Sequence, residues 1–192
     1  MSEMTDTPHI DVALSPASTD DLPDLGRRLQ TAFALALKDD PHHRPDDEPI
    51  PSDRELRECF DAPESEVLHV TANGERVGGM VLRIDPADHR NGLELFFIDP
   101  EHHSLGLGRR AWSAAERRHP ETRVWETMTP HFETRNIHFY VNVCGFDIVE
   151  FFNPYHPEPD RPADDPRKSG EDDLMFRFEK VMGPDDGSDA RR

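Results

Sequence analysis

The sequence has few cysteines and no long apolar run. Cys59 and Cys144 show neither the paired pattern of a disulfide framework nor the spacing of a zinc site. A membrane-spanning helix needs about 18 or more consecutive apolar residues, and no such stretch is present. The short acidic N-terminus also lacks the apolar core of a signal peptide. These absences predict a cytoplasmic protein with no membrane partner.

Positive charge is scarce as well. The chain has 22 basic residues against 40 acidic ones, which gives a formal net charge of -18. A phosphate backbone would be repelled by that charge, so a nucleic-acid partner is not expected. The acidic residues are spread along the whole chain, and only three of the basic residues are lysines. Solubility therefore explains the acidity as well as a cationic substrate would.

The length of 192 residues predicts one domain over 9–182, with disordered ends at 1–8 and 183–192. Alternating or apolar runs predict strands at 9–15, 67–72, 76–84, from 93 onward, 123–129, 146–152 and 174–181. Helical spacing predicts four helices, which lie between 18 and 38, at 52–60, between 106 and 119, and at 134–144. The prolines and charges of 39–51, 85–92 and 153–173 predict polar loops.

Local signals mark where several of these elements begin or end. Ser18 with Asp21 fits a helix-capping pair, and Ser52 and Thr134 are expected to cap the second and fourth helices. Gly145 is suited to end the fourth helix. The Asn73–Gly74 dipeptide predicts a tight hairpin turn between two strands.

The segment from Leu93 to Arg110 combines an apolar strand, a proline turn and a glycine-containing loop that opens a helix. Glycines let a ligand approach the backbone, and the N–H groups at a helix N-terminus attract anions. Gly106 and Gly108 are therefore predicted to cradle the pyrophosphate of a nucleotide cofactor. Taken alone, the loop fits a mononucleotide or a dinucleotide equally well.

Two motifs together resemble a known family. The first is His103-Ser104-Leu105-Gly106-Leu107-Gly108 after the strand, and the second runs from Asn136 through Phe139-Tyr140 to Gly145-Phe146. With the order of elements from 9 to 181, these motifs resemble the GNAT superfamily of acyl-CoA-dependent N-acetyltransferases. The resemblance implies an α/β (α+β) fold, with a mixed, mostly antiparallel sheet of about seven strands flanked by about four helices.

The same resemblance implies acetyl-CoA as the acyl-donor cosubstrate. The residues expected to contact it are Phe96, Phe97, Ile98, His103, Ser104, Leu105, Gly106, Leu107, Gly108, Arg109, Asn136 and Phe139. His103 departs from the Gln or Arg of the family, and Ser104 from a common Gly. Neither departure removes a backbone N–H. An imidazolium at position 103 would raise cofactor affinity at lower pH.

The chemistry calls for an acid and a base. Tyr140 matches the family tyrosine that protonates the leaving sulfur; the alternative is a core aromatic beside Phe139. Glu94 is the first candidate base, because apolar neighbours on its strand could raise its pKa. Glu126 or a water chain could take that role instead. Asn136 could hydrogen-bond the cofactor or simply belong to the start of its helix.

Eleven histidines invite a metal hypothesis. The adjacent pairs His42–His43 and His102–His103 would point apart in a strand or helix, so no metal site is predicted. His131, His138 and His156 lie near the inferred acceptor side or are polar surface residues.

The predicted activity is acetyl transfer to a primary amine, of a small molecule in the first instance, by direct attack. The alternatives are a non-catalytic acyl-CoA-binding domain and a protein N-terminal or lysine acetyltransferase. The acceptor is expected to contact 39–51 and 151–173, including Asn153, Tyr155 and His156. Exposed edge strands near the C-terminus would allow a homodimer.

Overall fold

The computed structural model describes residues 10–36, 49–103, 105–159 and 174–183. Several predictions therefore fall outside the described residues. They are the disorder of 1–8 and of nearly all of the C-terminal tail, most of the two polar loops 39–51 and 153–173, and the contact assigned to Ser104.

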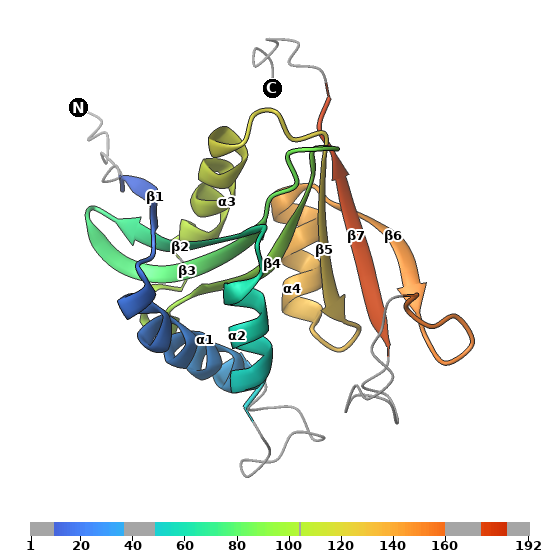
Figure 1. Cartoon of the computed structure of the whole chain (residues 1–192), viewed down its shortest axis with the longest axis horizontal. Helices are drawn as coiled ribbons and strands as arrows, with labels where there is room; N and C mark the ends of the chain where they lie inside the picture. Colours follow the sequence, from blue (N-terminus) through green and yellow to red (C-terminus); the bar gives the residue numbers. More distant parts are fainter. Residues whose placement is uncertain (1–9, 37–48, 104, 160–173, 184–192) are drawn as a thin grey trace, which may run out of the picture. The chain divides into compact units, whose positions relative to one another are not determined.

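The described chain contains seven strands and four α-helices (Figure 1). The strands are β1 (Val12–Pro16), β2 (Ser65–Ala72), β3 (Glu75–Arg83), β4 (Arg90–Ile98), β5 (Val124–Pro130), β6 (Asp147–Phe152) and β7 (Met175–Val181). The helices are α1 (Leu22–Ala36), α2 (Asp53–Asp61), α3 (Leu107–Arg118) and α4 (Thr134–His138). Among the described residues, no helix is long and apolar enough to cross a membrane.

The strands form one sheet in the order β1-β2-β3-β4-β5-β7-β6. β4 and β5 pair in parallel, as the crossover through α3 requires, whereas β1–β2, β5–β7 and β6–β7 pair antiparallel. The predicted fold class and order of elements are thus confirmed. The chain divides into two compact units, Met1–Val81 with Leu95–Arg118 and Leu82–Glu94 with His119–Arg192.

In the first unit, the capping pair lies where the sequence predicts, but it opens a 3₁₀-helix, Thr19–Asp21, that leads into α1 at Leu22. Ser18 and Asp21 form a capping box, in which the Asp21 carboxylate accepts hydrogen bonds from the Ser18 backbone N–H at 2.9 Å and from its hydroxyl at 2.6 Å. Leucines at helical spacing then form a single apolar face. One buried cluster of this unit consists of Leu25, Leu29, Leu56 and Phe97.

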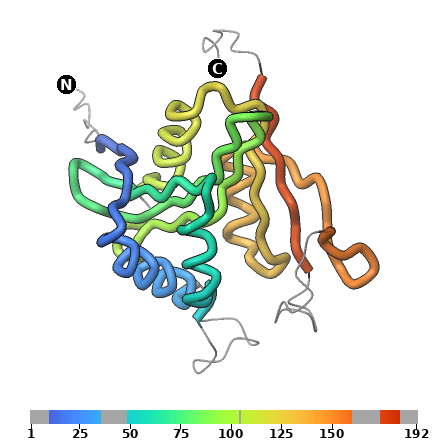
Figure 2. Tube along the Cα trace, in the orientation of Figure 1, coloured from blue at the N-terminus to red at the C-terminus, as the bar shows by residue number. Residues whose placement is uncertain are grey.

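Helix α2 and the following hairpin also agree with the sequence. Ser52 caps α2, and its backbone N–H donates to the Glu55 carboxylate at 2.8 Å. Asn73 and Gly74 have φ angles of 50° and 85°, the positive values that a tight primed turn requires. Figure 2 shows the chain reversing direction there, between β2 and β3.

Three predicted boundaries need correction. β1 begins at Val12 rather than at residue 9. β4 begins at Arg90, inside the predicted polar loop 85–92, because Arg90–Gly92 pair with Val124–Glu126 of β5. Thr134 is the first helical residue of α4, and Glu133 occupies the capping position, without a side-chain cap hydrogen bond.

The predicted helix 134–144 is also not uniform. It changes from the α-helix α4 to a π-helix over Phe139–Cys144. Gly145 ends it in the left-handed region at φ 79°, as predicted. The Lys180 ammonium donates to the Cys144 carbonyl at 2.6 Å and satisfies one of the terminal carbonyl groups.

Candidate functional site

The glycine loop of the first unit opens directly into α3. Gly106 has φ +67°, and a Cβ placed on it would meet no atom within 4 Å. The backbone therefore faces open space where α3, a helix of 12 residues, presents its first N–H groups. Leu107 anchors this end because its side chain is buried. The loop fits an anionic group such as a pyrophosphate.

His103 holds this loop against the preceding strand. Its Nε2 lies 2.8 Å from the Ile98 carbonyl oxygen. Because a carbonyl only accepts hydrogen bonds, Nε2 carries the hydrogen. The contact that the structure describes for this ring links the loop to β4. The predicted contact between the His103 ring and the cofactor stays a prediction. Its neighbours Leu105 and Arg109 are exposed.

The backbone of β4 offers hydrogen-bonding groups on one side of the strand. The Asp99 N–H donates to the Val77 carbonyl of β3 at 2.9 Å. A Cβ on Gly78 would approach the Phe97 carbonyl oxygen to 2.3 Å, so that oxygen also faces β3. Successive residues of a strand direct their N–H and C=O groups to opposite sides. Phe96 and Ile98 therefore direct theirs away from β3.

In the second unit, the backbone pairing of β4 with β5 is followed by a hydrogen bond from a side chain, that of Thr127. The parallel register joins Arg90–Gly92 to Val124–Glu126. At the next position the Thr127 hydroxyl donates to the Leu93 carbonyl at 2.9 Å. β5 continues to Pro130 and remains paired with β7 along its length. A side-chain donor thus satisfies the last carbonyl of this parallel pair.

Tyr140 lies in the π-helix with its ring in an aromatic cluster. Its ring centroid is 5.9 Å from that of Phe146 and 5.5 Å from that of Phe178. Burial raises the pKa of Tyr140 to about 12, so the phenol remains protonated near neutral pH. Tyr140 is thus a core aromatic with a protonated hydroxyl, and its role as the acid stays a prediction.

The two candidate bases have different surroundings. The Glu94 carboxylate accepts a hydrogen bond from the Arg83 Nε at 3.1 Å, and its side chain is 43% exposed. Glu94 is thus an exposed carboxylate with an arginine partner, and its role as the base stays a prediction. Both Glu126 oxygens accept guanidinium hydrogen bonds, from Arg83 at 3.2 Å and Arg90 at 2.5 Å, and Arg177 lies 3.5 Å away. Of the two, Glu94 is the more exposed carboxylate, because the Glu126 side chain is 23% exposed.

These residues belong to a larger charged network that the sequence analysis missed. The arginines are Arg83, Arg90 and Arg177, and the glutamates are Glu94, Glu126, Glu150 and Glu179. Hydrogen bonds from His156 and Arg177 lower the pKa of Glu150. Burial opposes the same effect at Glu179, yet hydrogen bonds from Arg177 and Arg90 lower its pKa. The alternation of charged residues along β4, β5 and β7 is the signal that could have suggested this network.

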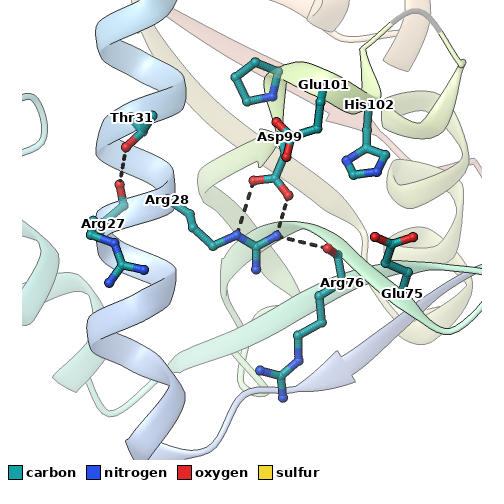
Figure 3. Close-up of a pocket in the computed structure, with 9 residues that line it drawn as sticks. Arg27, Arg28, Thr31, Glu75, Arg76, Asp99, Glu101 and His102 are labelled. Atoms are coloured by element: carbon teal, nitrogen blue, oxygen red, sulfur yellow. Dashed lines mark hydrogen bonds and ion pairs between the residues drawn. The ribbon is translucent and has the colours of Figure 1, made fainter.

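The first unit also contains a polar pocket of about 270 Å³ beside α1 (Figure 3). Arg28 reaches into it and donates to both carboxylate oxygens of Asp99, and at 3.1 Å to the Arg76 carbonyl. Asp99, Glu101 and His102 place potential metal-ligand atoms within 4.8 Å of one another. The Asp99 oxygens are occupied by a cation already, because Arg28 binds both. We therefore assign no metal to this cluster.

Asn136, His138 and Phe139 lie on α4 and its continuation, whereas His156 follows β6. Asn136 is half-buried, and its backbone carbonyl accepts from the Phe139 N–H. Phe139 packs edge-on against Tyr140, with ring centroids 5.8 Å apart. His138 is exposed, and its Nδ1 lies 3.0 Å from the Asn142 side-chain nitrogen. His156 lies 2.8 Å from the Glu150 carboxylate. The cofactor role of Asn136 and Phe139 stays a prediction.

Comparison with known proteins gives consistent matches. The family model described as "Acetyltransferase (GNAT) family" matches residues 29–146. An uncharacterized protein of Bacillus subtilis (strain 168), YrkN, is 45% identical over 174 residues, which cover 89% of this chain and 94% of that protein.

Solved structures are similar in fold at lower identity. The PaiA N-acetyltransferase of Thermoplasma acidophilum, in complex with coenzyme A, has a TM-score of 0.62 and 13% identity, and the match covers 90% of this chain and 99% of that one. The spermidine N-acetyltransferase of Vibrio cholerae, in complex with CoA and spermine, has a TM-score of 0.57 and 15% identity, and the match covers 88% and 95%.

Proposed function

We propose that this chain, which belongs to the GNAT acetyltransferase family, transfers an acetyl group from acetyl-CoA to a primary amine of a small molecule. The observation that carries the proposal is Tyr140, a phenol of the second motif that is buried among Phe139, Phe146 and Phe178 and whose pKa burial raises to about 12. A protonated phenol of this kind can deliver a proton to a leaving thiolate.

The chain offers groups suited to hold the cosubstrate. The loop at Gly106 and Gly108, with the N-terminus of α3, would bind the pyrophosphate. The backbone groups of Phe96 and the N–H of Ile98, which point away from β3, would meet the pantetheine arm, and a backbone N–H there would polarise the thioester carbonyl. The Ile98 carbonyl accepts a hydrogen bond from His103 instead. Acetyl-CoA supplies the activated acetyl group.

In the proposed reaction, the amine nitrogen attacks the thioester carbon and forms a new C–N bond. Glu94, directly or through water, accepts the proton that the nitrogen loses. The C–S bond then breaks with its electron pair on sulfur, and Tyr140 donates its hydroxyl proton to give the free thiol. Water exchange returns the proton from Glu94 to solvent and reprotonates Tyr140. Positioning of the two reactants supplies much of the rate enhancement.

A small amine as acceptor rests on two considerations. The acidic chain, with a net charge of -18, favours a cationic substrate over an anionic one. The similar fold of the Vibrio cholerae spermidine acetyltransferase supports a small amine as the first class to test. Polyamines, aminoglycosides and peptides with free N-termini should therefore be compared directly.

The test combines acetyl-CoA titration with a thiol-release assay over that panel. We expect acetyl-CoA binding and release of thiol with at least one amine. Tyr140→Phe should lower kcat about 100-fold, the range of general acid catalysis, while acetyl-CoA binding stays near that of the wild type. Binding without thiol release on any amine would contradict the proposal and favour a non-catalytic acyl-CoA-binding domain.

A further inference from the structure

Arg83 holds the Glu94 carboxylate from one side. The Arg83 Nε–H donates to Oε1 of Glu94 at 3.1 Å, and the two groups form an ion pair. Among the residues that the structure describes, Oε2 of Glu94 accepts no hydrogen bond. The carboxylate is thus bound through one oxygen and open at the other.

Arg83 is itself fixed by two further contacts. Its Nη1 donates to the Arg90 backbone carbonyl at 3.3 Å, and its Nη2 donates to the Glu126 carboxylate at 3.2 Å. All three nitrogens of the guanidinium are therefore engaged, each with a different acceptor. A planar group held at three points has little freedom to turn, so its Nε–H meets Glu94 from a defined direction.

The backbone beneath this ion pair carries no side chain. Gly92 and Glu94 are two positions apart on β4, so they face the same side of the sheet. A Cβ on Gly92 would lie 2.5 Å from Oε1 of Glu94 and 3.0 Å from Nη2 of Arg83. The pair therefore lies directly against the Gly92 backbone, and any larger residue there would displace it.

We propose that Arg83 is a positioning residue for Glu94 as the general base. Arg83 holds Oε1, and Oε2 receives the proton that the attacking amine nitrogen loses. That proton then passes from Oε2 to water, which restores the carboxylate. The guanidinium releases no proton of its own and holds Glu94 in one orientation throughout. This inference rests on the proposed function, because the base is that of the acetyl transfer.

Orientation is what an exposed carboxylate otherwise lacks. A glutamate that is 43% exposed has several staggered rotamers open to it, and only some of them would direct a lone pair at the amine. An ordinary surface ion pair gives little order, because two flexible side chains must be fixed at once. Here the Arg90 carbonyl, Glu126 and the Gly92 backbone already fix the guanidinium. Glu94 is thus prepared for the amine before the amine binds.

The first test observes the contact without using activity. Protein labelled with nitrogen-15 shows the arginine Nε–H signals, and the signal of Arg83 is identified by its loss in Arg83→Met. Glu94→Gln should shift this signal, because the charge that the Nε–H meets is removed. Glu150→Gln is the matched control, since Glu150 belongs to the same network but contacts Arg177 and His156. A signal that stays in place in Glu94→Gln, or moves equally in Glu150→Gln, overturns the inference.

The second test measures the consequence for turnover. Arg83→Met keeps an apolar stem and should lower kcat about tenfold, the scale of one hydrogen bond to a charged group, with little change in KM for acetyl-CoA. Arg90→Met is the matched control, because Arg90 is 38% exposed against 35% and pairs with Glu126 and Glu179 but not with Glu94. It should lower kcat far less. Equal losses in the two variants overturn the inference.

Double variants separate the orientation of Glu94 from a general loss of structure. In a Glu94→Gln background, Arg83→Met should cause no further loss of kcat, because the group that Arg83 positions is gone. Gly92→Ala adds no strain from a positive φ, yet its methyl group displaces the pair, so it should also lower kcat in the wild type alone. A loss of equal size in both backgrounds overturns the inference, as does a Gly92→Ala variant with wild-type kcat.

The outcomes separate this inference from the proposed function. Turnover that depends on Glu94 but not on Arg83 overturns the positioning role alone. A shifted Arg83 signal with no thiol release on any amine overturns the proposed function and, with it, the positioning role. Should Arg83→Met fail to fold, Arg83→Gln provides a neutral polar side chain without the Nε–H, and the same predictions apply.

Discussion

At the scale of single residues, the choice of base can be decided between two glutamates. Glu94 contacts Arg83 and is 43% exposed, whereas Glu126 has both oxygens occupied by guanidinium groups. A general base needs a free lone pair and a route for its proton. Glu94 meets both conditions better than Glu126 does.

We therefore predict that Glu94→Gln lowers kcat about 100-fold, because the amide cannot accept the proton. Glu126→Gln is the matched control, with the same change on the neighbouring strand, and should lower kcat far less. The measurement is kcat against pH for both variants with the best amine. Equal losses in the two variants would assign the base to neither carboxylate and favour a water chain.

At the scale of elements, the connection from β4 to α3 depends on one backbone conformation. Gly106 has φ +67°, a value that costs an L-residue about 1–2 kcal/mol. The loop must also present its N–H groups without a side chain in front of them. The positive φ of Gly106 and the access of a phosphate to the loop N–H groups are two separate requirements. A substitution at Gly106 can distinguish them.

Gly106→Ala should raise the Kd for acetyl-CoA about tenfold through the loss of one phosphate hydrogen bond. Gly74→Ala is the matched control, because Gly74 has φ +85° and equally open space but lies in the β2–β3 turn. Both variants should lose about 1 kcal/mol of unfolding free energy. Calorimetric titration and urea unfolding measure the two effects. Equal Kd values in both variants would contradict phosphate binding at Gly106.

At the scale of the whole molecule, hydrogen-bonded carboxylates make the free energy of unfolding depend on pH. The pKa values of Asp21, Glu150 and Glu179 all lie below their ordinary values in the folded chain. Hydrogen bonds from Ser18, joined by Arg76 and His69, are the cause at Asp21. A carboxyl group with a depressed folded pKa stabilises the folded state above its unfolded pKa. That contribution is lost as pH falls, because the unfolded chain binds protons more readily.

The contribution of these three carboxylates to the unfolding free energy should therefore be nearly constant from pH 7 down to about 5. It should fall as pH drops below the ordinary glutamate value of 4.5. Urea unfolding at about 0.2 M salt, which screens the long-range repulsion of an acidic chain, measures this dependence. Glu150→Gln should reduce the slope. An unfolding free energy that rises from pH 5 to 3 would contradict the prediction.

Much of this protein is determined by the sequence itself. The caps at Ser18 and Ser52, the Asn73–Gly74 turn and the Gly145 helix stop depend on residues a few positions apart, and the structure has all four. The fold class and family also follow from motifs that are local in the chain. Capping, turn conformation and apolar spacing are local physical effects, so a sequence can display them directly.

Only the tertiary structure decided which polar groups meet. The Thr127–Leu93 hydrogen bond spans 34 positions, and the Arg90–Glu179 contact spans 89. The Arg83 partner of Glu94 and the Thr127 donor to Leu93 were not predicted, because neither pairing leaves a local pattern. Strand register sets these contacts, and a shift of one residue would reverse the face of every side chain. The sequence thus determines the elements and the family, and the register of the sheet decides the surroundings of Tyr140 and Glu94.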